Sequence, residues 1–371
     1  MLKYRQSVLS VLGPHMTKKL LIVRGRSLYG LIYDRDRDAL STREIADYHN
    51  ELLTSSGLEK CAMVASEGWP IASAQRSNVP EPAEARRPAK RPVPALPAHH
   101  KPSKGALASL PDLEKRIDAY IQTQRRRGTL RPDESTSWSV YDLTSKDKLV
   151  DINEDKPMQA ASLVKPFFAM AFFHQVREGK LHYGPKSRRQ LTAMIRRSDN
   201  RATNWILRRL GGPQAVDELL KRSFSHLLQD TEIVEYIPWG GRTYRNKSSV
   251  HDYSRFLYAL WHDNVPGADE IKRIMALPNR DRIFTGARDI PKGTKVYDKT
   301  GSTRQLCGNM GILEVKGADG KKYAYTLVGV IEKDKPASNY TRWISSRGDL
   351  IREVSNIVYR EMDARHGLSA R

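Results

Sequence analysis

Residues 160–173 read AASLVKPFFAMAFF, a serine-containing segment followed by an apolar run. The run is apolar enough to form a buried helix, and Pro166 falls in its first turn, where proline is tolerated. Positions three apart on a helix share one face, so we expect Lys165 to lie beside the Ser162 hydroxyl. Burial would also lower the pKa of this lysine, which a lysine acting as a base requires. The segment therefore predicts a serine nucleophile with an adjacent amine.

A second serine–lysine pair has the same spacing but a different context. Ser145 and Lys148 lie in a polar stretch between two strand-like runs. There the lysine is expected to point into solvent from a charged hairpin turn. This pair is therefore excluded as a catalytic candidate.

Two further motifs follow the Ser162 segment along the chain. They are Ser198-Asp199-Asn200 and Lys299-Thr300-Gly301. With the first motif they form the set S-x-x-K, S-D-N and K-T-G, which supplies a nucleophile, a proton acceptor and positive charge from three parts of one chain.

These motifs and their flanks resemble the class A β-lactamase family and its penicillin-binding relatives over residues 107–365. Residues 160–165 look like the family's nucleophile segment, and MIRRSDNRATN at 194–204 is similar to its S-D-N segment. LGGP at 210–213 resembles the next helix junction, and VYDKTGS at 296–302 resembles the K-T-G strand. The resemblance implies an α+β fold, with an antiparallel sheet flanked by terminal helices and an inserted all-helical subdomain.

The resemblance also implies roles in acylation. Ser162 would attack a carbonyl and form an acyl-enzyme, with Lys165 as its base or proton relay. Ser198 would pass a proton toward the leaving nitrogen. The backbone N–H groups of Ser162 and Ser302 would form the oxyanion hole.

The remaining motif residues would bind the substrate. Asn200 would hold its side-chain amide, and Lys299 would attract its carboxylate with help from the Thr300 hydroxyl, beside Gly301. Simpler structural roles are open for two of them: Asn200 could cap a helix, and Lys299 could be a solvated strand lysine. No cofactor and no metal ion are expected.

The chain departs from the family where a deacylating glutamate is expected. Class A enzymes carry E-x-x-L-N in a loop after the S-D-N helix. Here Glu235 is nearest the expected place and Glu232 is the other candidate, but neither is followed by Leu-Asn at the right spacing. A misplaced glutamate would leave the acyl-enzyme long-lived.

A second departure concerns the arginine that binds the substrate carboxylate in many members of the family. Met310 stands near its place in Gly308-Asn309-Met310-Gly311. Arg304, or another of the many arginines, is the candidate replacement.

Three functions fit these motifs. Hydrolysis of β-lactams through an acyl-enzyme is the leading hypothesis. The alternatives are a D-alanyl-D-alanine peptidase acting on peptidoglycan stems, and a penicillin-binding sensor that is acylated without turnover. Release of the acyl group distinguishes them.

Composition narrows the choice of partners. The 371 residues carry a formal net charge of +21, from 63 basic and 42 acidic side chains. Such a balance favours anionic partners such as acidic wall polymers. No zinc-finger spacing or RNA-binding aromatic motif accompanies the basic residues, so nucleic acid is not expected. We expect a monomer with a small-molecule β-lactam or stem-peptide ligand.

The location of the protein is inferred from this chemistry alone. The sequence has no clear signal peptide and no apolar run that approaches a membrane span. A wall-related substrate predicts a periplasmic or extracellular protein.

Three regions are predicted along the chain. Residues 1–78 have no motif, although residues 42–53 look helical. Residues 79–106 form a proline- and arginine-rich linker, because seven prolines prevent helix and sheet there.

The catalytic domain is predicted over residues 107–365. Hydrophobic periodicity gives its elements. Helices are expected at 113–126, 190–222 with a break at 211–213, 250–261 and 341–361. Strands are expected at 137–141, 149–152, 308–315 and 323–332, with a turn at 318–320.

Overall fold

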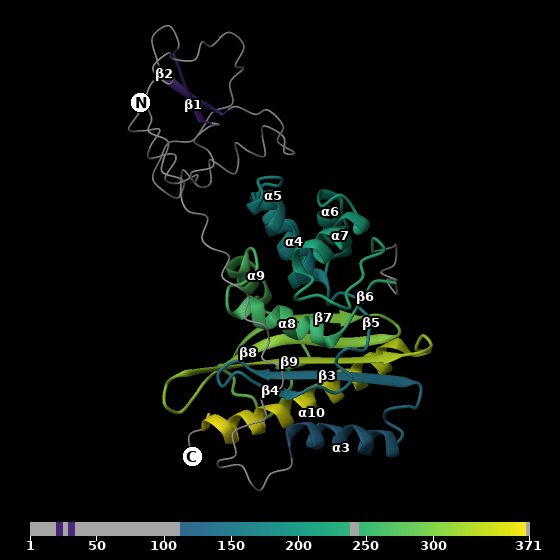
Figure 1. The fold of residues 1–371 in the computed structure, drawn as a ribbon. Helices are drawn as coiled ribbons and strands as arrows, with labels where there is room; N and C mark the ends of the chain where they lie inside the picture. The colour runs from purple at the N-terminus through teal and green to yellow at the C-terminus, as the bar shows by residue number, and fades with distance from the viewer. Residues whose placement is uncertain (1–19, 25–28, 34–111, 238–244, 369–371) are drawn as a thin grey trace. The chain divides into compact units, whose positions relative to one another are not determined.

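The computed structural model is drawn in colour in Figure 1 for the residues it describes, which are 20–24, 29–33, 112–237 and 245–368. Strands β1 (Leu20–Arg24) and β2 (Tyr29–Tyr33) pair as an antiparallel hairpin. The helix predicted at 42–53 and the linker predicted at 79–106 lie outside the described residues.

A five-stranded antiparallel sheet in the order β4-β3-β9-β8-β7 forms the centre of the fold. Its strands are β3 (Glu134–Asp142), β4 (Asp147–Val150), β7 (Lys295–Ser302), β8 (Leu306–Lys316) and β9 (Lys322–Lys333). The strands expected from sequence pair as predicted, with β8 and β9 joined through a turn in which Gly320 has a φ of 78°. Glycine adopts this left-handed conformation without the steric cost of a side chain.

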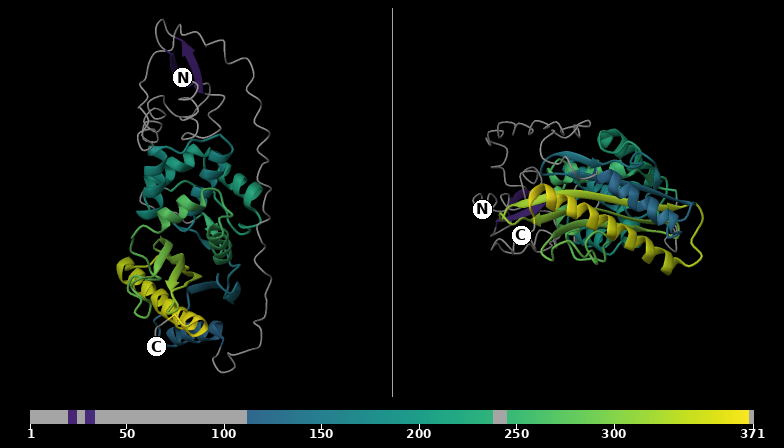
Figure 2. Two further views of the ribbon diagram at one scale, coloured as in Figure 1. Left: turned by 90° about the vertical axis from the view of Figure 1, so that its left-hand side faces the viewer. Right: turned by 90° about the horizontal axis from the view of Figure 1, so that it is seen from below.

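Helices α3 (Leu113–Arg126) and α10 (Tyr340–His366) lie together on one face of this sheet (Figure 1, Figure 2). Leu113, Ile117 and Ile121 recur at helical spacing and are buried, as the periodicity predicts. Helix α10 continues past its predicted end at 361 and stops at Gly367, which has a φ of 61°. Left-handed glycine is a common helix terminator.

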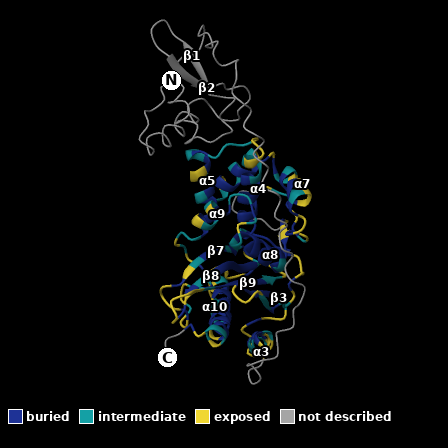
Figure 3. Cartoon of the chain, turned by 60° about the vertical axis from the view of Figure 1, so that its left-hand side comes forward, coloured by how far each residue is buried: buried dark blue, intermediate teal, exposed yellow. Residues whose placement is uncertain are grey.

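The other helices are α4 (Lys165–Arg177), α5 (Pro185–Arg196), α6 (Asn200–Arg209), α7 (Pro213–Phe224), α8 (Val250–Trp261) and α9 (Ala268–Met275). Helix α8 contacts β3 and β9 from the face opposite α10, and it is largely buried in Figure 3. The first nine residues of α4 are buried on all sides, which fits its uninterrupted apolar sequence. None of the described helices has the length and apolar composition needed to cross a bilayer.

Three details differ from the sequence prediction. The helical run expected at 190–222 breaks at residues 197–199 as well as at Gly211-Gly212. Helix α9 and the small sheet of β5 (Met158–Gln159) and β6 (Lys247–Ser248) were not predicted, because they are too short to show a period. The predicted fold is otherwise confirmed: an antiparallel sheet with terminal helices and a helical subdomain.

Candidate active site

Lys165 is the first residue of α4, and its side chain is fully buried. Its Nζ donates to the Ser198 carbonyl oxygen at 2.7 Å and to Asn200 Oδ1 at 3.0 Å, and it lies 3.2 Å from Ser198 Oγ. All three partners are uncharged. Burial, followed by the positive charge of Lys299, places the pKa of Lys165 well below its ordinary value. The amine can therefore be neutral and accept a proton.

Ser162 lies in the turn that leads into α4. The turn is closed by the Leu163 N–H, which donates to the Ala160 carbonyl at 3.0 Å, and Ala161 has a φ of 46°. The side chain of Ser162 is partly exposed. Within the described residues, the Ser162 N–H makes no hydrogen bond, so it remains available to a ligand oxygen.

Ser198 causes the break between α5 and α6. Its φ of 55° lies in the left-handed region, which costs a non-glycine residue energy and directs its carbonyl toward Lys165. Asp199 then caps α6, since its Oδ1 accepts the Ala202 N–H at 2.7 Å. The helix-cap role considered for Asn200 is therefore wrong, and its side chain faces Lys165.

Lys299 lies on β7 and is only 2% exposed. It is therefore not the solvated strand lysine of the structural alternative. Its Nζ donates to the Thr300 carbonyl at 2.8 Å. Burial lowers the pKa of Lys299 to about 8; the Asp298 carboxylate opposes this shift and the Arg282 guanidinium adds to it.

The first and third motifs meet because Leu163 packs against the K-T-G strand, whereas the S-D-N motif is joined to the first through Lys165. A β-carbon on Gly301 would stand 2.7 Å from Leu163 Cγ, and one on Gly308 would stand 2.9 Å from its Cδ1. Both distances are below normal carbon–carbon contact, so only glycine fits at these two positions. The glycine of the K-T-G motif thus allows β7 to approach the nucleophile turn.

Arg282 is a site residue that the sequence analysis did not identify. Its Nη1 donates to the Gly308 carbonyl at 2.8 Å, and its Nη2 donates to Ser302 Oγ at 2.7 Å. Arg304, the candidate from sequence, instead donates to the Ala337 carbonyl. No sequence signal distinguishes Arg282 among so many arginines, because its contacts come from residues distant in the chain.

The two candidate glutamates lie in the segment that follows α7. Glu232 is exposed, and its backbone pairs with Lys247. Glu235 accepts a hydrogen bond on Oε1 from the Arg245 N–H at 3.1 Å. Within the described residues, neither glutamate hydrogen-bonds to Ser162 or Lys165. The catalytic role of Glu235 stays a prediction.

Ile237, which is buried, ties the same segment to α6. The Asn204 side chain holds its backbone on both sides, donating to the Ile237 carbonyl at 2.7 Å and accepting its N–H at 2.9 Å. Asn204 follows Asn200 by one helical turn, so the two amides share a face of α6. The four-residue spacing of Asn200 and Asn204 was visible in the sequence, but the hydrogen bonds of Asn204 to Ile237 were not.

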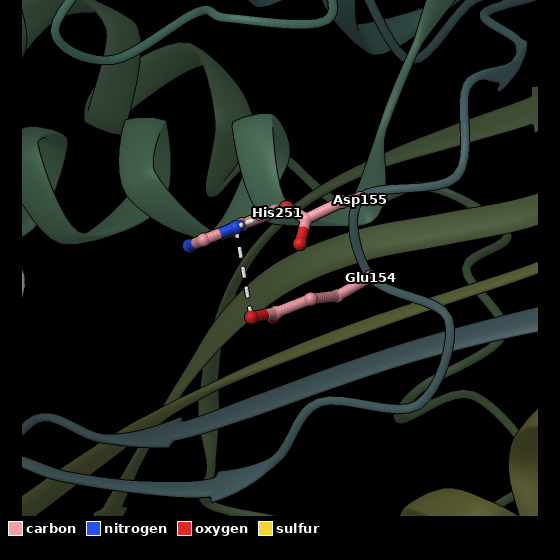
Figure 4. A group of neighbouring side chains, drawn as sticks. All are labelled: Glu154, Asp155 and His251. Atoms are coloured by element: carbon pink, nitrogen blue, oxygen red, sulfur yellow. Dashed lines mark hydrogen bonds and ion pairs between the residues drawn. The ribbon is translucent and has the colours of Figure 1, made fainter. Parts of the chain in front are cut away.

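A separate cluster could be considered as a metal centre (Figure 4). His251 Nδ1 lies 2.6 Å from Asp155 Oδ1 and 3.6 Å from Glu154 Oε1. However, Lys148 forms an ion pair with Glu154, and His251 lies in the first turn of α8, where the helix dipole is positive. Both features oppose a metal cation, so we interpret the cluster as a hydrogen bond between His251 and Asp155 beside an ion pair between Lys148 and Glu154. The sequence analysis expected Lys148 to point into solvent, and this prediction is wrong because Lys148 pairs with Glu154.

Comparisons with known proteins agree with this geometry. A model of the family described as "Beta-lactamase enzyme family" matches residues 112–186 and 185–362. A search of curated proteins found no match.

Solved structures share the fold at low identity. PBP-A superimposes with a TM-score of 0.55 and 22% identity, covering 69% of this chain and 97% of that chain. A point mutant of PBP-A, solved as an acyl-enzyme complex with penicillin G, gives 0.54 and 20%, covering 68% and 96%. A β-lactamase from Chitinophaga pinensis gives 0.55 and 16%, covering 68% and 100%.

Proposed function

The chain belongs to the beta-lactamase enzyme family, and we propose that Ser162 forms a long-lived acyl-enzyme with β-lactams and a transient one with D-alanyl-D-alanine stem peptides. One observation carries this proposal: the buried Lys165 amine has only uncharged hydrogen-bond partners. An amine in these surroundings is a base at neutral pH, when an ordinary lysine is not.

Acylation follows from the positions of three side chains. Ser162 Oγ attacks the carbonyl carbon, and its proton passes to the neutral Lys165 amine. The new Ser162–carbon ester forms as the carbon–nitrogen bond breaks. Ser198 Oγ, 3.2 Å from Lys165 Nζ, relays the proton to the leaving nitrogen. The free Ser162 N–H, with the Ser302 N–H, stabilises the negative oxygen.

Two cations bind the substrate carboxylate. Lys299 lies on the K-T-G strand, and Arg282 donates to Ser302 Oγ at the end of the same strand. The Thr300 hydroxyl is a further donor on this strand. The Oδ1 of Asn200 accepts a hydrogen bond from Lys165, which leaves Nδ2 to donate to the substrate's side-chain carbonyl.

Slow release of the acyl group is supported by the composition of the segment that follows Glu235. Residues 236–251 contain no aspartate or glutamate, and the Glu235 carboxylate is engaged by the Arg245 N–H. These features favour a penicillin-binding peptidase over an efficient β-lactamase. Its peptidoglycan substrate would place the protein outside the cytoplasmic membrane.

Fluorescent penicillin labelling with intact-mass analysis tests the proposal. We expect one adduct per chain, absent from Ser162→Ala but retained in Ser145→Ala, which removes the matched serine of the second S-x-x-K pair. A chromogenic cephalosporin should give a burst of one equivalent. Sustained turnover would instead establish a β-lactamase, and an unlabelled folded protein would overturn acylation altogether.

A further inference from the structure

Asn309 connects two segments of the site through a single buried amide. It lies on β8 and is fully buried. Its Nδ2 donates to Asp298 Oδ2 at 3.0 Å, and its Oδ1 accepts the Arg282 backbone N–H at 2.7 Å. Asparagine is poorly suited to the interior of a strand, so this position is explained by its hydrogen bonds.

The two segments that Asn309 joins carry the two cations of the site. Asp298 directly precedes Lys299 on β7. Arg282 lies outside the helices and strands, in a turn that Asp281 closes by accepting the N–H groups of residues 283–285. Its backbone is tied to the sheet by the Asn309 amide.

We infer that Asn309 is a positioning residue that sets the separation between the Lys299 ammonium and the Arg282 guanidinium. By doing so, it determines how strongly the enzyme prefers substrates that carry a carboxylate. The inference rests on the proposed function, because it concerns the recognition step that precedes attack by Ser162.

An amide is the side chain that fits both partners. One end must donate to a carboxylate and the other must accept from an N–H, and asparagine does both at once. Losing either partner would leave a buried polar group unsatisfied. Asn279 Nδ2 donates to the other oxygen of Asp298 at 2.8 Å, which fixes the plane of that carboxylate.

The charges around Asp298 affect the pKa of its carboxyl group. It is faced by the Asp281 carboxylate from the turn and by Lys299 on its own strand, and Lys299 is in turn affected by the Arg282 charge. Burial, followed by the Asp281 charge, raises the pKa of Asp298 to about 6. A second carboxylate placed at position 309 would compete with Asp298 for one proton.

The test compares acylation by a penicillin with acylation by its methyl ester, which lacks the negative charge. The measured quantity is the ratio of the two second-order acylation rate constants. Arg282→Ala should reduce this ratio about tenfold, and Asn309→Ala should reduce it by a similar factor, since loss of a charged hydrogen bond has this size. The double variant should show little further loss, because both changes act on one cation.

Gln305→Ala is the matched control. Gln305 lies immediately before β8 and donates its side-chain amide to the carbonyls of Lys333 and Asp334, not to Arg282, Asp298 or Lys299. It should leave the ratio unchanged. General damage to the fold would slow both substrates equally and would leave the ratio constant.

Asn309→Asp supplies a second, shape-preserving variant. Protonated, the new carboxyl can donate to Asp298 and keep the network; ionised, it repels Asp298. Compared with the unmodified protein at the same pH, the variant should give a similar ratio at acidic pH and a progressively lower one as pH rises. Changes in Lys165 protonation cancel between the two substrates, and the comparison at equal pH removes the effect of Lys299 titration.

The outcomes separate this inference from the proposed function. If neither penicillin nor its ester acylates the unmodified protein, the proposed function fails. If the protein is acylated but Asn309→Ala keeps the full ratio, and Asn309→Asp keeps it at every pH, the positioning role of Asn309 is overturned.

Discussion

Leu163 lies so close to Gly301 that a β-carbon at position 301 would stand 2.7 Å from the leucine Cγ. Leu163 directly follows Ser162, and Gly301 belongs to the same motif as Lys299. This single contact therefore couples the position of the nucleophile to the strand that carries the cation.

Gly301→Ala is expected to slow acylation by penicillin about 10- to 100-fold. The added methyl group must displace Leu163, and overpacking of this kind costs about 1–3 kcal/mol. Stopped-flow acylation measures the effect. Gly293→Ala is the control, because a β-carbon there meets nothing within 4 Å. Equal acylation rates in the two variants would contradict the coupling.

Acylation should depend on pH through two lysines. Lys165 acts when neutral, so the rate rises with pH through its lowered pKa. Lys299 acts when protonated, so the rate falls above its pKa of about 8. Rates of penicillin acylation across pH should therefore give a bell-shaped profile.

Lys165→Arg provides the check on this profile. A guanidinium stays protonated at every accessible pH, so it cannot accept the Ser162 proton. We expect no measurable acylation in this variant, with unchanged circular dichroism. Acylation that rises normally with pH would exclude Lys165 as the base.

Ile237→Glu should convert the protein toward turnover. Asn204 holds the backbone at position 237 and lies one helical turn from Asn200, which contacts Lys165, so we expect a glutamate at position 237 to reach the acyl ester and activate water. General-base catalysis of this kind contributes at least about 100-fold. The deacylation rate is followed by loss of the penicillin adduct in mass spectra.

Ile237→Gln is the matched control, because it has nearly the same shape without the base. Its adduct should persist as in the unmodified protein. If both variants release penicillin equally fast, the increase comes from a loosened segment and not from a carboxylate.

The stability of the fold should fall in acid through Glu134. Burial alone would raise the pKa of Glu134, but the Arg347 guanidinium, at 2.6 and 2.7 Å, and other donors hold it below its ordinary value. The depressed pKa contributes stability above the unfolded-state value of about 4.3, and this is lost as pH falls through the folded-state pKa. Urea unfolding across pH measures the loss.

Glu134→Gln should cost about 3–5 kcal/mol near neutral pH, because it leaves Arg347 buried and without its counter-charge. The unfolding free energy of the variant should also depend less on pH in the acidic range. An unchanged unfolding free energy would show that the ion pair makes no net contribution.

Much of the fold follows from local patterns. Helices α3 and α8 begin and end where hydrophobic periodicity placed them, and the β8–β9 hairpin forms around its predicted turn. These elements are long enough for one period to dominate. Helix α9 has eight residues, too few for that signal.

The active-site residues divide in the same way. Contiguous motifs in the sequence identified five of them: Ser162, Lys165, Ser198, Asn200 and Lys299. No motif identified Arg282, Asn204 or Ile237, because each is defined by hydrogen bonds to distant residues. The left-handed conformation of Ser198 was missed because it interrupts an otherwise helical pattern.

The sequence by itself determined the family, and its contiguous motifs identified Ser162 and Lys165, although the structure places Ser162 in the turn before α4 and not on the helix that begins at Lys165. Only the tertiary structure decided the surroundings of the Lys165 amine and the segment tied to α6. Burial lowers the pKa of Lys165, and the Asn204 amide holds the backbone of Ile237. Both effects depend on packing between segments far apart in the chain, which no local pattern encodes.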